Sequence, residues 1–370
     1  MKQSMDFLNL KEVNAPWEQE LEQAALRVIR SGRYVGGPEV EAFETALAAV
    51  AGTRYAVGVS NGLDALRLML RADIARGRLK PGDSIIVPAN TYIATVLAIR
   101  DAGLTPVLAD PDEHTMNLTG DALRKALTPD VRAVMTVHLY GAPAYDAEMA
   151  RVIKEHGLRL YEDNAQAIGA TAYDGRPTGS LGAAAAFSFY PTKNIGALGD
   201  AGAVTTDDAE LARTVRMLAN YGSEQRYHNV YEGFNCRLDT IQAAMLGVKL
   251  THLPEVTARR REMAALYDSL IVNPLIKTPV PVPGHVYHHY VIRTEQRDRL
   301  KDFLSRRGIP TDILYPTPVH MQPCYSFLSE QGSLPASEKV ARSVLSLPLA
   351  GHLSNEDIHK VVAAVNEFGK

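Results

Sequence analysis

The chain has 370 residues, of which 46% are hydrophobic and 22% charged, which is the composition of a folded globular protein rather than of a disordered, collagen-like or coiled-coil chain. Its 39 basic residues nearly balance its 42 acidic ones, and no block of like charges occurs, which excludes a general nucleic-acid-binding surface. The sequence has no apolar run of the ~20 residues that span a bilayer, no secretory signal and only two cysteines, so we expect no membrane partner and a cytoplasmic location.

The N-terminal half of the chain alternates predicted helices with predicted strands. Apolar residues at helical spacing predict helices over residues 16–31 and 38–51, which end at Gly32 and Gly52. Short apolar runs separated by amphipathic stretches predict strands at residues 55–59, 84–88, 105–109, 133–138, 158–163, 184–190 and 202–206. Seven such strands with interleaved helices indicate an α/β fold whose mostly parallel sheet is covered on both faces.

The pattern changes near Asp239. A long helical region is predicted over residues 240–272, and Pro-rich, strand-like pieces follow over residues 278–294. We therefore predict an N-terminal segment and a large domain over residues 1–249, and a smaller α+β domain over residues 250–370.

A single lysine, Lys193, follows an apolar strand and a proline in the stretch FSFYPTKNIGALGDAGAV. A lysine needs a lowered pKa to act as nucleophile or base, and a low-charge position at a strand end beside flexible glycines favours this. On this stretch alone, a surface lysine in a turn remains the simpler interpretation.

Two polar residues, Asp163 and Gln166, stand at the carboxyl end of another apolar strand, in LRLYEDNAQAIGA. In open α/β sheets this edge is where ligands bind. The alternative is that Asp163 only caps a following helix. Because a buried strand rarely ends in two adjacent carboxylates, Glu162 and Asp163, we also expect a charge partner for them.

Two further strand ends could contact a ligand. SNGLDAL places a small polar turn before a helix, whose free N–H groups suit phosphate, and VPANTYIAT places Tyr92 where its ring could stack on a planar ligand. Each has an ordinary structural explanation when taken alone. The motifs G-x-G-x-x-G and G-x-x-x-x-G-K-[ST] are both absent, so neither NAD nor ATP is expected.

Taken together, a phosphate-binding turn, an aromatic plane, a strand-end acid and a lone lysine are the parts that hold pyridoxal phosphate (PLP). The chain resembles the sugar aminotransferases of the DegT/DnrJ/EryC1/StrS family, which implies a PLP-dependent fold of the aspartate aminotransferase type. The resemblance extends over nearly the whole length and is carried by GRYVGGPEVEAFE, SNGLDAL, VPANTYIAT, VHLYGAP, EDNAQAIGA, FSFYPTKNIGALGDAGAV, NYGS, GFNCRLDTIQAA and YPTPVHMQPCY.

The resemblance implies a role for each matching residue. Lys193 would be the catalytic, Schiff-base lysine, Asp163 the partner of the pyridine nitrogen and Gln166 the residue that bonds the ring hydroxyl. The other implied positions are Ser188, Gly62 and Leu63 for the phosphate, Tyr92 for stacking on the ring, Asn235 for the phosphate in the neighbouring subunit, and Tyr221 and His320 for the nucleotide-sugar pocket. A homodimer with shared active sites is therefore also implied.

The resemblance further implies the reaction. An amino group would pass from L-glutamate to a nucleotide-linked 3-keto-6-deoxysugar, with dTDP as the carrier. Amination of a 4-keto sugar or of a cyclitol remains an alternative, as does a PLP-binding regulatory protein without turnover. Ile168 and Thr192 depart from many relatives, which have His and Gly there, and this bears on substrate preference rather than on transamination.

The histidine cluster HVYHH suggests a metal site at first sight. Strand alternation would place His288 and His289 on opposite faces, and no acidic or cysteine ligand is near in sequence, so we expect no metal. One of these histidines, or His285, is instead expected to line the sugar pocket. Cys236, beside Asn235, is expected to be a packed thiol.

Overall fold

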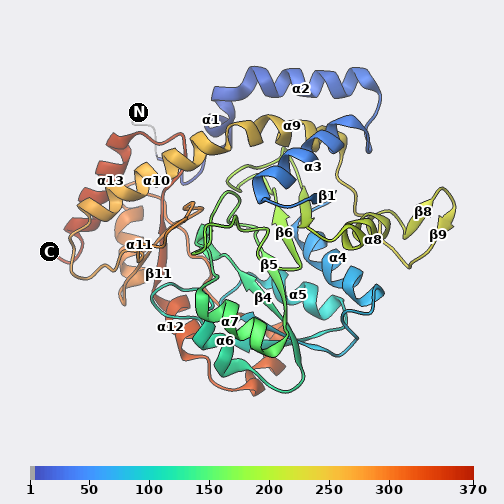
Figure 1. The fold of residues 1–370 in the computed structure, drawn as a ribbon. Coiled ribbons are helices and arrows are strands. Elements are labelled where there is room, and N and C mark those ends of the chain that lie inside the picture. The colour runs from blue at the N-terminus through green and yellow to red at the C-terminus, as the bar shows by residue number, and fades with distance from the viewer. Residues whose placement is uncertain (1–4) are drawn as a thin grey trace.

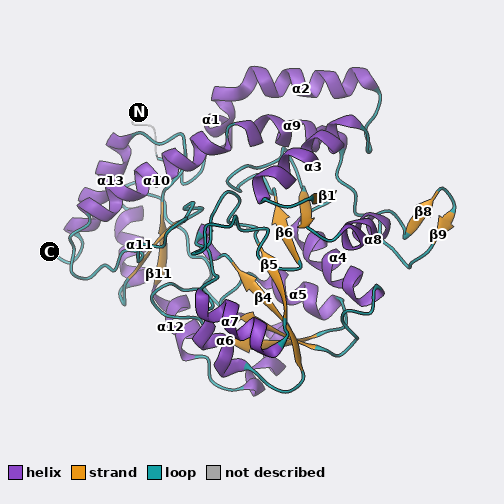
Figure 2. Ribbon diagram, in the orientation of Figure 1, coloured by secondary structure: helices purple, strands orange, loops and turns teal. Residues whose placement is uncertain are grey.

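The structure, a computed structural model, describes residues 5–370 and contains one large seven-stranded sheet (Figures 1 and 2). The strands lie in the order β1-β7-β6-β5-β4-β2-β3, and β7 runs antiparallel to both of its neighbours whereas the other pairs are parallel. Their bounds are β1 Tyr55–Val59, β2 Ser84–Pro88, β3 Thr105–Ala109, β4 Val131–Val137, β5 Arg159–Asp163, β6 Ala184–Ser188 and β7 Gly202–Thr206. The predicted α/β fold with a mostly parallel sheet is thus confirmed.

Helices cover both faces of this sheet because its strands are apolar on both sides. On one face α4, α5 and α8 pack against side chains such as Val57 and Tyr161; on the other, α3 and α9 pack against Phe187, and α6 and α7 against Val134. The helix bounds are α1 Leu10–Asn14, α2 Glu18–Ser31, α3 Pro38–Ala51, α4 Gly62–Ala75, α5 Ile93–Asp101, α6 Gly120–Ala126, α7 Ala147–His156, α8 Ala209–Ala219, α9 Thr240–Thr251, α10 Leu253–Leu270, α11 Arg297–Ser305, α12 Pro335–Ser343 and α13 Asn355–Glu367. Within residues 5–370, none of the helices combines the length and apolar character needed to cross a bilayer.

The C-terminal part of the chain builds a second apolar cluster around two antiparallel strands, β10 (Tyr290–Arg293) and β11 (Val344–Leu347). Helices α10, α11 and α13 pack around this pair (Figure 1). The long predicted helical region divides at His252 into α9 and α10. Because α10 contributes Leu253 to a cluster of the large sheet and Met263 to the second cluster, a domain boundary at residue 250 stays a prediction.

The strand-like interpretation of residues 278–294 is largely wrong, because only β10 within it is a strand. Gly284 and Tyr287 adopt left-handed backbone conformations, with φ of 78° and 47°, which interrupt any regular strand. The segment instead bonds to the loop after β4, where the Val286 amide donates to the Gly141 carbonyl.

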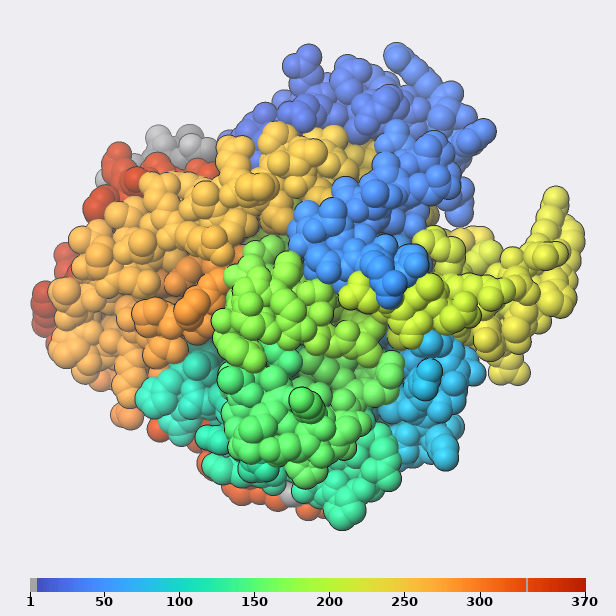
Figure 3. Space-filling view, in the orientation of Figure 1, coloured from blue at the N-terminus to red at the C-terminus, as the bar shows by residue number. Residues whose placement is uncertain are grey.

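A small hairpin projects from the body of the molecule (Figure 3). It consists of β8 (Ser223–Gln225) and β9 (His228–Asn229). Tyr227 at its tip is 85% exposed, and the Arg226 guanidinium lies 4.9 Å from the centre of its ring.

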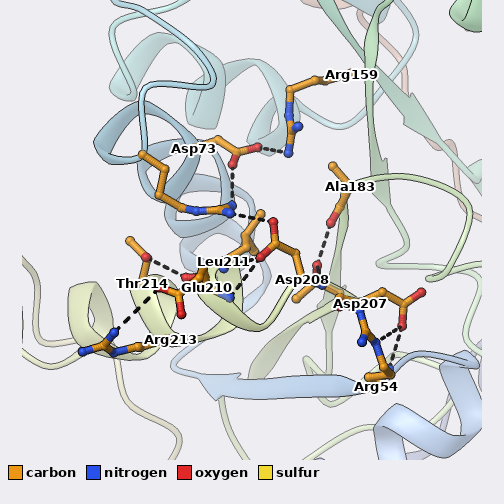
Figure 4. A network of polar contacts seen from close by, with 12 residues as sticks. Arg54, Asp73, Arg159, Ala183, Asp207, Asp208, Glu210, Leu211, Arg213 and Thr214 are labelled. Carbon is orange, nitrogen blue, oxygen red and sulfur yellow. Dashed lines mark hydrogen bonds and ion pairs between the residues drawn. The ribbon is translucent and has the colours of Figure 1, made fainter.

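A buried ionic network ties α4 to β5 and α8 (Figure 4). Asp73 is fully buried, accepts a hydrogen bond from the Tyr161 hydroxyl and forms ion pairs with Arg76 (3.1 Å) and Arg159 (2.5 Å). Arg76 also pairs with Asp208, the residue that caps α8, at 2.6 Å. One carboxylate on α4 therefore fixes that helix to the strand that carries Asp163.

Candidate active site

The carboxyl ends of β4, β5 and β6 and the N-termini of α4 and α5 surround a cavity of about 440 Å³. In a parallel sheet these ends lie at one edge, where ligands commonly bind. The cavity brings together seven of the predicted site residues, namely Gly62, Leu63, Tyr92, Asp163, Gln166, Ser188 and Lys193.

Asp163, the last residue of β5, lines this cavity and is only 6% exposed. Its Oδ2 accepts a hydrogen bond from the Thr95 hydroxyl (2.8 Å), and its Oδ1 accepts one from the Ala165 amide (3.2 Å). Burial raises the pKa of Asp163, whereas both hydrogen bonds and the charge of Lys193 act to lower it. Because no helix of the described chain begins at Asp163, the helix-cap interpretation does not apply.

Lys193 lies in the loop after β6, and its side chain is half-buried. Its backbone amide donates to the Tyr190 carbonyl at 2.8 Å, which closes the turn that presents the side chain. Burial lowers the pKa of the amine, against the opposing effect of the Asp163 carboxylate. Among the residues that line the cavity it is the one lysine or arginine. An amine with a lowered pKa can exchange protons at neutral pH, as a general base requires.

Gln166 is held at both ends of its amide. Its Oε1 accepts from the Tyr140 backbone N–H (2.6 Å), and its Nε2 donates to the Tyr315 hydroxyl (3.2 Å). Tyr140 has a φ of 61°, a conformation that few non-glycine residues adopt. The Tyr315 ring lies 5.2 Å from that of Tyr92, so the two rings form an aromatic wall of the cavity.

The start of α4 presses closely against β6 and β7. A Cβ on Gly62 would lie 2.6 Å from the Cβ of Ser188, and a Cβ on Gly202 would lie 2.4 Å from the carbonyl carbon of Asn61. Glycine is required at both positions because any side chain would overlap these atoms. Asn61 caps the helix by accepting from the Asp64 amide at 2.9 Å. The first amides of α4 and the Ser188 hydroxyl therefore lie together at one end of the cavity, an arrangement that suits an anion.

Sequence reasoning missed His138, which also lines the cavity. Its Nδ1 accepts from the Ala144 amide (2.9 Å), so its Nε2 carries the proton and donates to Glu162 (3.0 Å). Glu162 also accepts from the amides of Gly179 and Leu181, both at 2.7 Å. His138 is thus the buried hydrogen-bond partner of Glu162 alone, whereas the charge that acts most on Asp163 is that of Lys193. His138 follows β4 directly, so the strand-end argument used for Asp163 could have found it.

Three predicted residues lie outside the set that lines the cavity. Asn235 is exposed and forms an isolated β-bridge with Asn220. Tyr221 is 50% exposed, and the Arg237 guanidinium lies 5.5 Å from the centre of its ring. His320 is 5% exposed, with its Nε2 3.6 Å from Glu338. Within one chain these residues do not join the site, and their roles stay predictions.

The structure corrects the interpretation of the histidine cluster. His288 and His289 do not lie on opposite faces, because their segment is not a strand and their ring centres are 4.1 Å apart. His288 Nδ1 donates to the Asn194 side-chain oxygen at 2.6 Å. None of the three histidines is among the residues that line the large cavity; His285 and His289 border a separate one of about 20 Å³.

Cys236 is a packed thiol, as expected. It is free and 4% exposed, and burial raises its pKa, which makes it a poor nucleophile.

Known proteins resemble the chain along its whole length. A sequence model of the DegT/DnrJ/EryC1/StrS aminotransferase family matches residues 17–366. A dTDP-3-amino-3,6-dideoxy-alpha-D-galactopyranose transaminase of Aneurinibacillus thermoaerophilus is 45% identical over 366 residues, which is 98% of this chain and 99% of the relative. A dTDP-3-amino-3,4,6-trideoxy-alpha-D-glucose transaminase of Streptomyces venezuelae is 46% identical over 368 residues, 98% of this chain and 96% of the relative.

Solved structures share the fold. S. venezuelae DesV, crystallised in complex with a ketimine intermediate, is 46% identical, with a TM-score of 0.95 and coverage of 99% of each chain. Bacillus subtilis ntda, with bound cofactor PMP, is 28% identical, with a TM-score of 0.90 and coverage of 99% of this chain and 85% of that one.

Proposed function

Since the chain belongs to the DegT/DnrJ/EryC1/StrS aminotransferase family, we propose that it aminates a dTDP-linked 3-keto-6-deoxysugar with L-glutamate as donor. It is a nucleotide-sugar aminotransferase that depends on PLP. The observation that carries the finer assignment is that two relatives, 45% and 46% identical over 98% of the chain, are both named as transaminases of dTDP-3-amino sugars.

The residues of the cavity fit this cofactor. The close approach of Gly62 to Ser188 makes a cradle for its phosphate, and the buried Asp163 carboxylate suits a protonated pyridine nitrogen. Gln166 offers an amide near the same edge, and Tyr92 offers a ring face. When bound, PLP supplies an electron-accepting ring that stabilises a carbanion.

Lys193 is assigned both the covalent attachment of the cofactor and the proton transfers. Burial lowers the pKa of its amine, which favours the neutral form that can accept the proton from the donor carbon and return it at the acceptor carbon. One amine serves both half-reactions because glutamate and the sugar ketone occupy the same place in turn. Glutamate leaves as 2-oxoglutarate and the ketone becomes an amine, so the transfer balances.

A homodimer with shared sites is part of the proposal. A nucleotide diphosphate, the cofactor phosphate and a dicarboxylic donor are all anions, yet within residues 5–370 of one chain a single lysine and no arginine line the cavity. In this proposal a second copy supplies the missing cations, and the exposure of Asn235 in one chain supports its role at the site of the neighbouring chain. The two free cysteines, Cys236 and Cys324, support a reducing cytoplasm as its location.

The test is a screen of the purified holoenzyme with glutamate and with dTDP- and UDP-linked 3-keto and 4-keto sugars. We expect a 3-amino product from the dTDP-linked 3-keto sugar, identified by mass and NMR, and 2-oxoglutarate in equal amount. Preferential amination of a 4-keto sugar or of a cyclitol ketone would replace the substrate assignment. Absence of turnover with every ketone and donor would favour a regulatory PLP-binding protein.

A further inference from the structure

A second cavity, of about 150 Å³, lies behind the loop that carries Lys193. Thr192 and Lys193 line both this cavity and the large one, so the loop of residues 191–196 is the partition between them. The other walls come from the segment around α1 and from α9 and α10, which lie together in Figure 1. Nothing in the proposed reaction uses this space.

Two buried cations line this rear cavity without an acidic partner. Lys249 is 5% exposed, and its Nζ donates to the Gly196 carbonyl at 2.5 Å. Arg260 is 6% exposed, and one of its terminal nitrogens donates to the carbonyls of Tyr287 (3.1 Å), His288 and Leu349 (both 3.0 Å). Its Nε has no hydrogen-bond partner among the described residues. Among residues 5–370, neither side chain forms an ion pair with a carboxylate.

Burying such charges is unfavourable unless an anion compensates them. Burial lowers the pKa of Lys249 to about 8 and that of Arg260 to about 10. Both shifts reflect the same unfavourable transfer of a charge out of water. His352, also in the wall, has two buried ring nitrogens to which no side chain of residues 5–370 is hydrogen-bonded.

The remaining charges of the cavity do not compensate these cations. Glu12 and Glu255 line it but are exposed to solvent, and Glu255 faces His252 at 3.8 Å. Arg259 is already paired with Glu262 at 2.8 Å.

We propose that the rear cavity is a binding site for a small monocarboxylate, which compensates Lys249 and Arg260 and steadies the Lys193 loop. Its volume matches cavities that hold a molecule of about six heavy atoms. Trp17, Leu10 and Val256 supply an apolar wall that suits the hydrocarbon end of such an anion. Because Lys249 also bonds the Gly196 carbonyl, the bound anion acts on the same loop that presents Lys193 to the front cavity.

The test uses the holoenzyme, in which the front phosphate cradle is filled by the cofactor, and acetate as the probe. Saturation-transfer NMR on the acetate methyl group should show binding in the wild-type protein. Lys249→Met removes the charge, and Val256→Phe fills the cavity without touching a charge; each should weaken binding about tenfold or more, the contribution of one charge-assisted contact. Lys301→Met, on the exposed face of α11, is the matched control and should bind as the wild type does.

Equal binding of acetate by all four proteins would place it elsewhere and overturn the proposal, as would no binding by the wild type. Should both cavity variants fail to fold, wild-type holoenzyme crystals soaked in bromide decide the matter. An anomalous peak inside the rear cavity supports the site, and its absence refutes it. Because the readout is binding rather than turnover, this result is independent of the substrate screen.

Discussion

As the proposed partner of the pyridine nitrogen, Asp163 must be ionised, and its burial opposes this by raising its pKa. We expect Asp163→Asn to bind PLP but to turn over about 10²–10³-fold more slowly, because a neutral amide no longer stabilises a protonated ring; the effect of an opposite charge on such a pKa is about one to three units. The measurement is kcat together with the cofactor content and visible spectrum of the purified variant. Near-normal turnover would show that the carboxylate is not the partner of the ring.

The Thr95 hydroxyl should set the pH range in which Asp163 is ionised. It donates to the carboxylate at 2.8 Å and lies 2.7 Å from the Thr91 hydroxyl, and its hydrogen bond lowers the pKa of Asp163. Thr95→Val removes that bond without changing the size of the side chain, so the pKa of Asp163 rises. Activity that requires an ionised carboxylate is lost below the pKa of that carboxylate. The acid limb of the kcat profile should therefore move to higher pH.

The control for this prediction is Thr136→Val, which removes a buried hydroxyl bonded to the Ala144 carbonyl instead. Its acid limb should coincide with that of the wild type. Identical pH profiles for Thr95→Val and the wild type would mean that the Thr95 hydroxyl contributes to packing but does not affect the ionisation of Asp163.

Sequence reasoning finds Asp163 because it ends an apolar strand, and Lys193 because it lies in the loop just after one. The order of residues along the chain therefore marks this edge of the sheet. No comparable sequence feature identifies Thr95, because it lies inside α5. Only the folded structure brings it to the Asp163 carboxylate, 68 positions away along the chain. Tyr315 is likewise joined to Gln166 across 149 positions. Contacts of this kind depend on tertiary packing, which no local pattern encodes.

The elements themselves were largely predictable, since strands buried on both faces read as continuous apolar runs and glycine ends a helix. Gly32 and Gly52 stand just beyond α2 and α3 with φ of 67° and 69°, the left-handed conformation that stops a helix. Residues 278–289 could not be predicted in this way. Their valines suit a strand, but their prolines cannot donate to a sheet, and Tyr287 takes a positive φ that only the surrounding contacts impose.

Among the contacts between elements, the ionic network around Asp73 should contribute strongly to the free energy of unfolding, because it joins α4 to β5 and α8. Asp73→Ala leaves Arg159 and the Tyr161 hydroxyl without their acceptor in a buried place, and we expect a loss of about 3 kcal/mol of unfolding free energy. Denaturant unfolding of the holoenzyme, with Asp302→Ala on the exposed face of α11 as control, measures it. A loss no greater than that of the control would mean that the network is dispensable.

For the whole molecule, subunit exchange tests the proposed shared site. Lys193→Ala and Asn235→Asp should each be inactive, the second because a carboxylate beside the cofactor phosphate repels it. In a mixed dimer one site combines the intact lysine of one chain with the intact asparagine of the other, while the second site collects both defects. A two-fold interface forms both sites at once, so recovery should approach about half of wild-type activity per mixed dimer.

In the control, each variant is mixed with itself under the same exchange conditions. This should restore no activity. A fully active monomer, or mixed dimers without recovery, would refute the shared site.

The antiparallel strand β7 has a consequence for how the chain reaches this structure. β1 lies at the edge of the sheet and pairs with β7, although residues 59 and 202 are far apart in the chain, with the other strands between them. A ribosome that adds about 5–20 residues per second needs on the order of ten seconds or more to cover that stretch. During this delay β1, with its apolar side chains, has no neighbouring strand to pair with. The first strand to emerge is therefore among the last to enter the sheet. Shielding by a chaperone would matter most at this point.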